Sequence, residues 1–280
     1  MLNRRHFAYL TAAGAVACSL SSRLAAQEPT TAKPPSSADV DRSMDAARQS
    51  ARLQIAMLVY PQFTALDLIG PHTFLASLNA DVHLVWKTRE PVPLDRGGTA
   101  IVPTTTLRDS PRDLDVLFVP GGLAGTAAVM KDDSVLDFLA DRGSRAKYVT
   151  SVCTGSLVLG CAGLLKGYKA TSHWATRDLL PSLGATPVAE RVVEDRDRIT
   201  GAGVTSGIDF GLVLAARLRD PTYAQMLQLI NEYDPHPPFH AGNPQEAGSA
   251  LTAHLESRLA PGLKELEEAA NQARTKRKLT

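Results

Sequence analysis

The chain has 280 residues, of which 44% are hydrophobic and 21% charged, and its formal net charge is +1. This composition is ordinary for a globular protein with a buried core, and the length suits one large α/β domain or two small ones. No basic stripe with interleaved aromatic residues is present, which argues against nucleic acid as a partner.

The first 26 residues have the pattern of a signal peptide. Arg4 and Arg5 form a charged start, an apolar run follows over 7–20, and small residues end the segment at Ala25-Ala26. This order of charge, short apolar run and small residues is typical of an export signal. The run is shorter than the about 20 apolar residues that cross a bilayer, so we expect no integral membrane span.

The arginine pair lies two residues before Phe7, which favours the twin-arginine export route. An ordinary Sec signal with two chance arginines is the alternative. A lipid anchor on Cys18 is less favoured, because Ala15 stands where lipoprotein sites usually carry a large apolar residue. We therefore expect an exported, periplasmic protein.

The rest of the chain divides into three parts. Residues 27–50 are rich in Pro, Ser and Thr and lack apolar periodicity, so we expect a flexible tether. Residues 51–245 carry the pattern of a folded domain. Residues 246–280 predict a helical extension, interrupted at Pro261-Gly262, whose sparse apolar positions suit packing on a neighbouring helix or on a partner chain.

Short apolar runs alternate with segments of helical spacing along the domain. Strands are expected over 53–60, 82–86, 115–119 and 148–152, with a hairpin over 191–193 and 198–200. Helices are expected over 66–78, 132–142, 155–165, 205–219 and 222–233. This alternation predicts an α/β fold with a mostly parallel sheet sandwiched by helices. In such sheets ligands bind at the carboxyl ends of the strands, which selects residues 61–67, 120–125 and 153–156.

Cys153 is the most informative residue of these segments. It follows a hydrophobic strand and precedes the small-residue turn Thr154-Gly155-Ser156, which opens a helix. The arrangement is like a nucleophile elbow, although the Gly-x-Ser-x-Gly sequence is absent. A helix N-terminus favours a thiolate, so we expect it to lower the pKa of Cys153. The alternative is that Cys153 is a small buried hydrophobic residue.

Cys161 lies among leucines in the same predicted helix, which indicates a core residue. On one helix, Cys153 and Cys161 would be about 12 Å apart. A disulfide requires Cα atoms within about 7 Å, so both cysteines should remain free thiols.

Five blocks of the chain stand out together, at residues 65–71, 149–160, 170–174, 205–209 and 228–244. In this order they resemble the ThiJ/PfpI superfamily, and within it the isonitrile hydratases. The likeness spans about residues 53–245 and implies a flavodoxin-like α/β fold and a homodimer.

The resemblance implies that Cys153 is the nucleophile and Asp67 the acid/base, with Thr154 in a supporting catalytic role. An isonitrile carbon accepts a nucleophile while its nitrogen gains electron density and needs a proton. Cys153 would attack this carbon to form a thioimidate, and Asp67, with a pKa raised by burial, would then orient water to release an N-substituted formamide. The structural alternatives are that Asp67 caps the following helix and that Thr154 merely starts one.

Three further residues are candidates for substrate binding. Gly121 and Gly122 form a tight turn that allows close backbone approach and could supply an N–H group, or could be merely structural. His173 is either a pocket residue or a hydrogen-bonded structural one. Asp209, near a helix start, is expected to be structural.

No cofactor or metal is expected. His236 and His240 are four residues apart, but the prolines around them prevent the helix that would place both on one face. No Cys/His cluster has zinc spacing, and no Gly-rich phosphate loop is present. The resemblance implies a small-molecule substrate.

Two alternative functions remain open. Another cofactor-free ThiJ/PfpI activity, such as a glyoxalase or an amidase, would use the same cysteine. However, Thr154 after Cys153 breaks the Cys-His pattern of the peptidase-like members. The other alternative is a ligand-sensing or redox-sensing module, for which cysteine oxidation and binding without turnover are expected.

Overall fold

The computed structural model describes residues 34–279, and the expected export signal lies outside this range. In this part of the chain a central sheet has seven strands in the order β10-β11-β7-β6-β1-β2-β5. Neighbouring strands run parallel except β10 and β11, which form the expected antiparallel hairpin. The strands are β1 (Leu53–Leu58), β2 (Ala80–Trp86), β5 (Thr105–Thr106), β6 (Val116–Val119), β7 (Tyr148–Val152), β10 (Val192–Asp195) and β11 (Arg198–Gly201).

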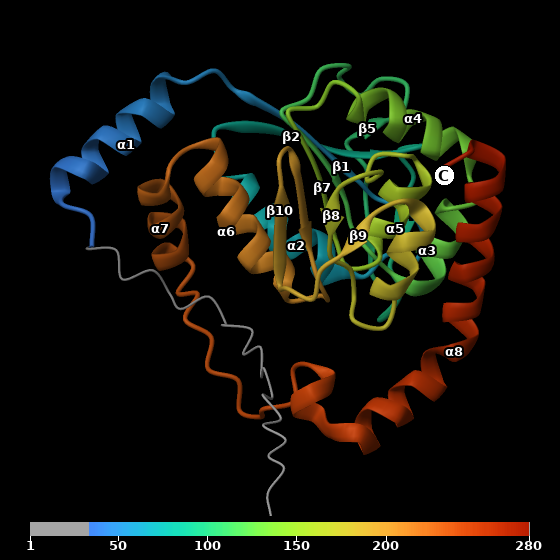
Figure 1. Cartoon of the computed structure of the whole chain (residues 1–280). Helices are drawn as coiled ribbons and strands as arrows, with labels where there is room; N and C mark the ends of the chain where they lie inside the picture. The colour runs from blue at the N-terminus through green and yellow to red at the C-terminus, as the bar shows by residue number, and fades with distance from the viewer. Residues whose placement is uncertain (1–33, 280) are drawn as a thin grey trace, which may run out of the picture. The chain divides into compact units, whose positions relative to one another are not determined.

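Helices cover both faces of this sheet (Figure 1). On one face α2 packs against α6, which in turn packs against α7, and on the other face α3, α4 and α5 lie together. The predicted mostly parallel α/β sandwich is therefore confirmed. The helices are α1 (Ser37–Gln49), α2 (Ala65–Leu75), α3 (Leu123–Val129), α4 (Asp133–Gly143), α5 (Gly155–Cys161), the 3-10 helix η1 (Arg177–Leu183), α6 (Ser206–Leu218), α7 (Pro221–Ile230) and α8 (Pro244–Arg277).

The core lies along the central strands. Residues 55–58 of β1 and 116–119 of β6 are almost completely buried. A parallel sheet covered on both faces requires such continuous apolar runs, because side chains on either side meet a helix layer. Because β1, β6 and β7 are parallel neighbours, their carboxyl ends meet at one edge of the sheet. The segments 61–67, 120–125 and 153–156, which were selected from the sequence, come together at this edge.

The expected flexible tether is wrong over residues 37–49, which form helix α1. Ser36 and Asp39 make a reciprocal capping box, in which each side chain accepts the backbone N–H of the other residue. Ser43 then donates a hydrogen bond of 2.7 Å to Asp220, at the start of α7. The helix is stabilised by its cap and by this tertiary contact. Neither interaction requires apolar residues at helical spacing, so the sequence of this segment shows no strong apolar periodicity.

Helix α8 also differs from its prediction. Pro261 lies within the helix, and the non-helical residue is Gly248, whose φ is 79°. The second half of α8 packs on α3, α5 and η1, so tertiary packing keeps the helix continuous through the proline.

Strand β5 of the central sheet and two pairs of very short strands were not predicted, because two residues are too few to show a periodic pattern. The two pairs are β3 (Val92–Pro93) with β4 (Ala100–Ile101), and β8 (Lys169–Ala170) with β9 (Thr186–Pro187). No helix within residues 34–279 combines the length and the apolar character needed to cross a bilayer.

Candidate active site

Cys153 lies in the turn between β7 and α5. Its φ is 59°, a left-handed conformation that non-glycine residues seldom adopt. Its backbone N–H donates to the carbonyls of Gly201, the last residue of β11, and of Ala202, which follows it, at 3.1 and 2.7 Å. These bonds hold the strained turn and fix where the thiol lies. The predicted elbow-like placement at the strand-to-helix junction is confirmed.

Asp67 lies in the first turn of α2 and is fully buried. The N-cap of that helix is Thr64, so the alternative that Asp67 serves as the cap is wrong. One carboxylate oxygen, Oδ2, accepts the N–H of Gly121 at 3.0 Å. The other, Oδ1, is buried and has no conventional hydrogen-bond partner among the described residues. A buried acceptor without a partner is costly, and it suits a group that takes up a proton or holds a water.

The thiol of Cys153 interacts with this carboxylate, and the pair shifts both pKa values. Burial raises the pKa of Asp67 to about 7, although the thiol and the Gly121 N–H both oppose the increase. Burial, reinforced by the Asp67 carboxylate, raises the pKa of the Cys153 thiol well above its usual value. Above neutral pH the pair is therefore a thiol beside a carboxylate.

The predicted rise in the pKa of Asp67 is confirmed, but the predicted lowering for Cys153 is wrong. Helix α5 has only seven residues, so its N-terminal field is small. Burial of the sulfur and the neighbouring negative charge outweigh this field. At neutral pH Cys153 is therefore a thiol, and a reaction through its sulfur would require a nearby base to take the proton.

Thr154 belongs to a buried line of hydroxyl groups. Its Oγ1 accepts the N–H of Gly122 at 2.9 Å and lies 2.7 Å from the hydroxyl of Thr126. Thr126 in turn lies 3.1 Å from the hydroxyl of Tyr60, which donates to the Pro120 carbonyl at 2.7 Å. Thr154 is the N-cap of α5, but its side chain makes no capping bond. Its hydroxyl instead links the β6–α3 turn to the β7–α5 turn, which carries Cys153.

Thr154→Val should lower both stability and turnover. The substitution keeps the shape but removes the acceptor of the Gly122 N–H and the partner of Thr126, which leaves buried polar groups unpaired. We expect the free energy of unfolding to fall by about 1–3 kcal/mol, measured by urea denaturation. Thr154→Ser is the matched control because it keeps the hydroxyl. Equal losses in the two variants would contradict this role.

Gly121 lies between the three catalytic candidates. A Cβ added there would lie 2.6 Å from Thr154 N, 2.7 Å from Asp67 Oδ2 and 2.7 Å from Cys153 Cβ. Gly121 and Gly122 do not offer free N–H groups to the cavity, because these N–H groups donate to Asp67 and Thr154. The expectation of an N–H supplied to substrate is therefore wrong, and the turn acts by holding those two side chains.

Gly121→Ala should abolish turnover even where the protein folds. The added methyl group must push apart Asp67, Cys153 and Thr154, none of which can move without breaking a buried contact. Steady-state turnover and circular dichroism of the purified variant would measure both effects. Gly70→Ala is the control, since its nearest neighbour would lie at 3.4 Å. An active Gly121→Ala enzyme would contradict the tight packing described here.

A cavity of about 450 Å³ opens above Cys153 and Thr154. Its wall is largely apolar, and two of its side chains, Leu259 and Leu263, come from α8. His173 also lines it, while its ring Nδ1 accepts the N–H of Ala175 at 3.3 Å, so both expectations for this residue hold together. Burial lowers the pKa of His173, which keeps the ring neutral at pH 7.

Sequence reasoning missed several of these residues. Leu259 and Leu263 follow Leu251 and Leu255 at intervals of four, a signal of one helical face that could have placed the α8 pair against the domain. Tyr60 and Thr126 carry no comparable pattern.

The structure also places the residues expected to be structural. Asp209 forms an ion pair with Arg191 and accepts a hydrogen bond from the hydroxyl of Tyr233 at 2.6 Å, which confirms its structural role.

Cys161 is completely buried, and burial raises its pKa to about 12. Both Cys161 and Cys153 are free thiols. Among residues 34–279 no three His, Cys, Asp or Glu side chains are grouped as metal ligands.

Comparison with known proteins identifies the family. The model of the DJ-1/PfpI family matches residues 53–217. An isonitrile hydratase of Pseudomonas putida is 52% identical over 225 residues, which cover 80% of this chain and 97% of that protein. The crystal structure of a ThiJ/PfpI family protein from Pseudomonas syringae superposes with a TM-score of 0.79 at 52% identity, covering 86% of this chain and 98% of the other. Protein DJ-1alpha of Drosophila melanogaster is 34% identical over 131 residues, or 46% of this chain and 60% of that protein. The chain therefore belongs to the DJ-1/PfpI family.

Proposed function

We propose that the protein is a hydro-lyase that hydrates an isonitrile to an N-substituted formamide. The observation that carries this proposal is the buried pair of the Cys153 thiol and the Asp67 carboxylate, beside an apolar cavity large enough for a small molecule. The 52% identity to an isonitrile hydratase, over 97% of that enzyme, supports the same chemistry.

In the first half of the proposed reaction the sulfur of Cys153 bonds to the terminal carbon of the isonitrile. Asp67 takes the thiol proton as the bond forms and delivers it to the same carbon. The product is a thioimidate, in which a carbon–nitrogen double bond remains and the carbon carries sulfur and hydrogen. A carboxyl group with a pKa of about 7 suits both proton transfers near neutral pH.

In the second half Asp67 orients a water molecule onto the thioimidate carbon. The water oxygen bonds to carbon, one water proton reaches the nitrogen, and the carbon–sulfur bond then breaks. The remaining proton returns to sulfur through Asp67, so that the thiol is restored and the formamide leaves. The unpartnered Oδ1 of Asp67 is the acceptor available to hold this water.

The decisive experiment is incubation of the protein with a simple alkyl isonitrile, followed by detection of the N-formamide by mass spectrometry. Turnover in water enriched in the heavy oxygen isotope should place one labelled oxygen in the product. If the folded, reduced protein makes no formamide, the proposal fails, and methylglyoxal and simple amides become the substrates to test. A redox-sensing role is less well supported, because sensor cysteines are exposed and have low pKa values, whereas Cys153 has neither property.

We further propose that the protein is exported and acts as a homodimer. On α2, Leu66 and Ile69 are 37% and 43% exposed, which suits contact with a second chain. Fractionation of cells that produce the full chain tests the location, and light scattering of the purified protein tests the dimer.

A further inference from the structure

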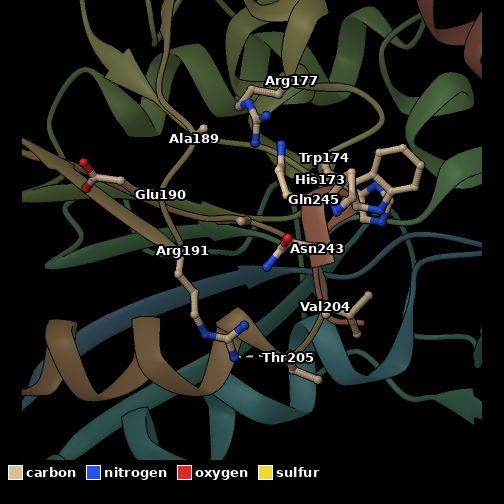
Figure 2. A pocket seen from close by; sticks show the side chains of 14 residues that line it. His173, Trp174, Arg177, Ala189, Glu190, Arg191, Val204, Thr205, Asn243 and Gln245 are labelled. Carbon is tan, nitrogen blue, oxygen red and sulfur yellow. Dashed lines mark hydrogen bonds between the residues drawn. The ribbon is translucent and has the colours of Figure 1, made fainter. Parts of the chain in front are cut away.

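A second cavity adjoins the one above Cys153. It has a volume of about 440 Å³ and shares two wall residues, His173 and Val204, with the catalytic cavity (Figure 2). Ala202 also lines it, and the carbonyl of Ala202 accepts the backbone N–H of Cys153 at 2.7 Å. The two cavities therefore adjoin at His173 and Val204, close to the turn that carries Cys153, and one extended small molecule that passes these two residues would occupy both.

The second cavity contains an arginine without a partner. The guanidinium of Arg177, the first residue of η1, makes no hydrogen bond or ion pair with any residue of the described chain, although the residue is only half-exposed; its backbone N–H donates to the His173 carbonyl at 3.0 Å. Arg191 of the same cavity is different, because it pairs with Asp209 and donates to Thr205. An unpaired guanidinium in a cleft presents a planar fork of hydrogen-bond donors. This arrangement suits the binding of an anion.

The neighbours of Arg177 indicate which anion fits. Figure 2 shows the Arg177 guanidinium and the Gln245 amide pointing toward each other, and Gln245 likewise has no hydrogen-bond partner among residues 34–279. Asn243 is different because both polar atoms of its amide bond to Glu246. The carboxylate of Glu190 points away from Arg177 in the same view. One guanidinium and one amide match a singly charged carboxylate, whereas a doubly charged phosphate would leave one charge without a partner in a cavity that also contains Glu190.

We propose that Arg177, with Gln245, binds a carboxylate carried by the substrate, so that the enzyme acts on isocyano-carboxylates. The isonitrile carbon lies at Cys153 while the carboxylate occupies the second cavity, and the chain that joins them passes His173 and Val204. This assignment rests on the proposed hydratase function, and it identifies the class of substrate for that reaction.

The test compares an isocyanoalkanoate with its methyl ester, in the wild-type protein and in Arg177→Gln. We expect the acid to have a KM at least about tenfold below that of the ester in the wild type, as a charge-assisted hydrogen bond provides. Arg177→Gln should remove this difference by raising KM for the acid alone, with kcat for the ester unchanged. Arg177→Lys should restore part of the preference. Arg112→Gln, an exposed arginine just before β6, is the matched control and should change neither substrate.

The proposal is overturned if the wild type treats acid and ester alike, or if Arg177→Gln raises both KM values equally. If the wild type hydrates no isonitrile, the proposed function fails, but the carboxylate site is still tested by calorimetry with a straight-chain alkanoate. Binding to the wild type that is lost in Arg177→Gln would support the site. Equal binding to both proteins, or none to the wild type, would reject it.

Discussion

Cys153→Ala should lower the hydration of an isonitrile by at least about a thousandfold, to the rate observed without protein. The variant removes the atom that forms the covalent bond to the substrate, and no other cysteine lines the cavity among the described residues. Folding should survive, because alanine has a similar size and bears the same left-handed φ with a similar strain. Formamide production and thermal unfolding, measured on the same preparation, would show both results.

Cys161→Ala is the matched control for that experiment. Cys161 is the last residue of α5, the short helix that follows Cys153, and it is fully buried in the core, so its loss should leave a cavity. We expect a destabilisation of roughly 1 kcal/mol with turnover intact. Retention of activity in Cys153→Ala, or its loss in Cys161→Ala, would contradict the assignment of the nucleophile.

Asp67→Asn should abolish turnover and yet stabilise the folded protein at alkaline pH. The pKa of Asp67 is about 7 in the folded protein against an ordinary value of 3.8. The protonated carboxyl is thus favoured by folding, so its contribution to stability is present at low pH and is lost as pH rises through 7. Asparagine stays neutral at every pH. We expect the variant to gain roughly 4 kcal/mol over the wild type at pH 8 and little at pH 4, measured by urea denaturation at both values.

The same pKa sets the pH profile of the wild type. Asp67 must be a carboxylate to accept the thiol proton, so kcat/KM should rise with pH, by up to tenfold per unit below about pH 7, and then level off. The plateau should extend into the alkaline range, because the pKa of Cys153 lies well above its ordinary value. A profile that is flat through pH 7, or an Asp67→Asn variant that keeps this profile, would show that Asp67 is not the base.

The sequence was sufficient to predict the centre of the site but not its surroundings. The apolar runs that end before Asp67, Gly121 and Cys153 predict that these residues meet, because parallel strands present their carboxyl ends at one edge. The direction of the Cys153 pKa was not predictable in this way. It depends on complete burial and on the distance to one carboxylate, and neither quantity is visible in the order of residues.

The residues that line the cavities could not be predicted from the sequence either. Leu259 and Leu263 line the Cys153 cavity although they lie more than a hundred residues further along the chain, and Arg177 is an ordinary surface residue in the sequence. Contacts of this kind depend on how α8 and η1 pack onto the sheet. Helix α1 was missed for a related reason, since a cap and one contact with Asp220 stabilise it without an apolar period.

The place of α8 has a consequence for how such enzymes diversify. The family pattern ends at residue 217, but Leu259 and Leu263 on α8 form part of the wall around the reacting sulfur. The proposed catalytic pair, Cys153 and Asp67, thus lies inside the family pattern, whereas part of the apolar cavity wall lies outside it. Substitutions in α8 would change which molecules the cavity accepts while Cys153 and Asp67 stay unchanged. Exchange of α8 between relatives would therefore be a direct way to alter selectivity.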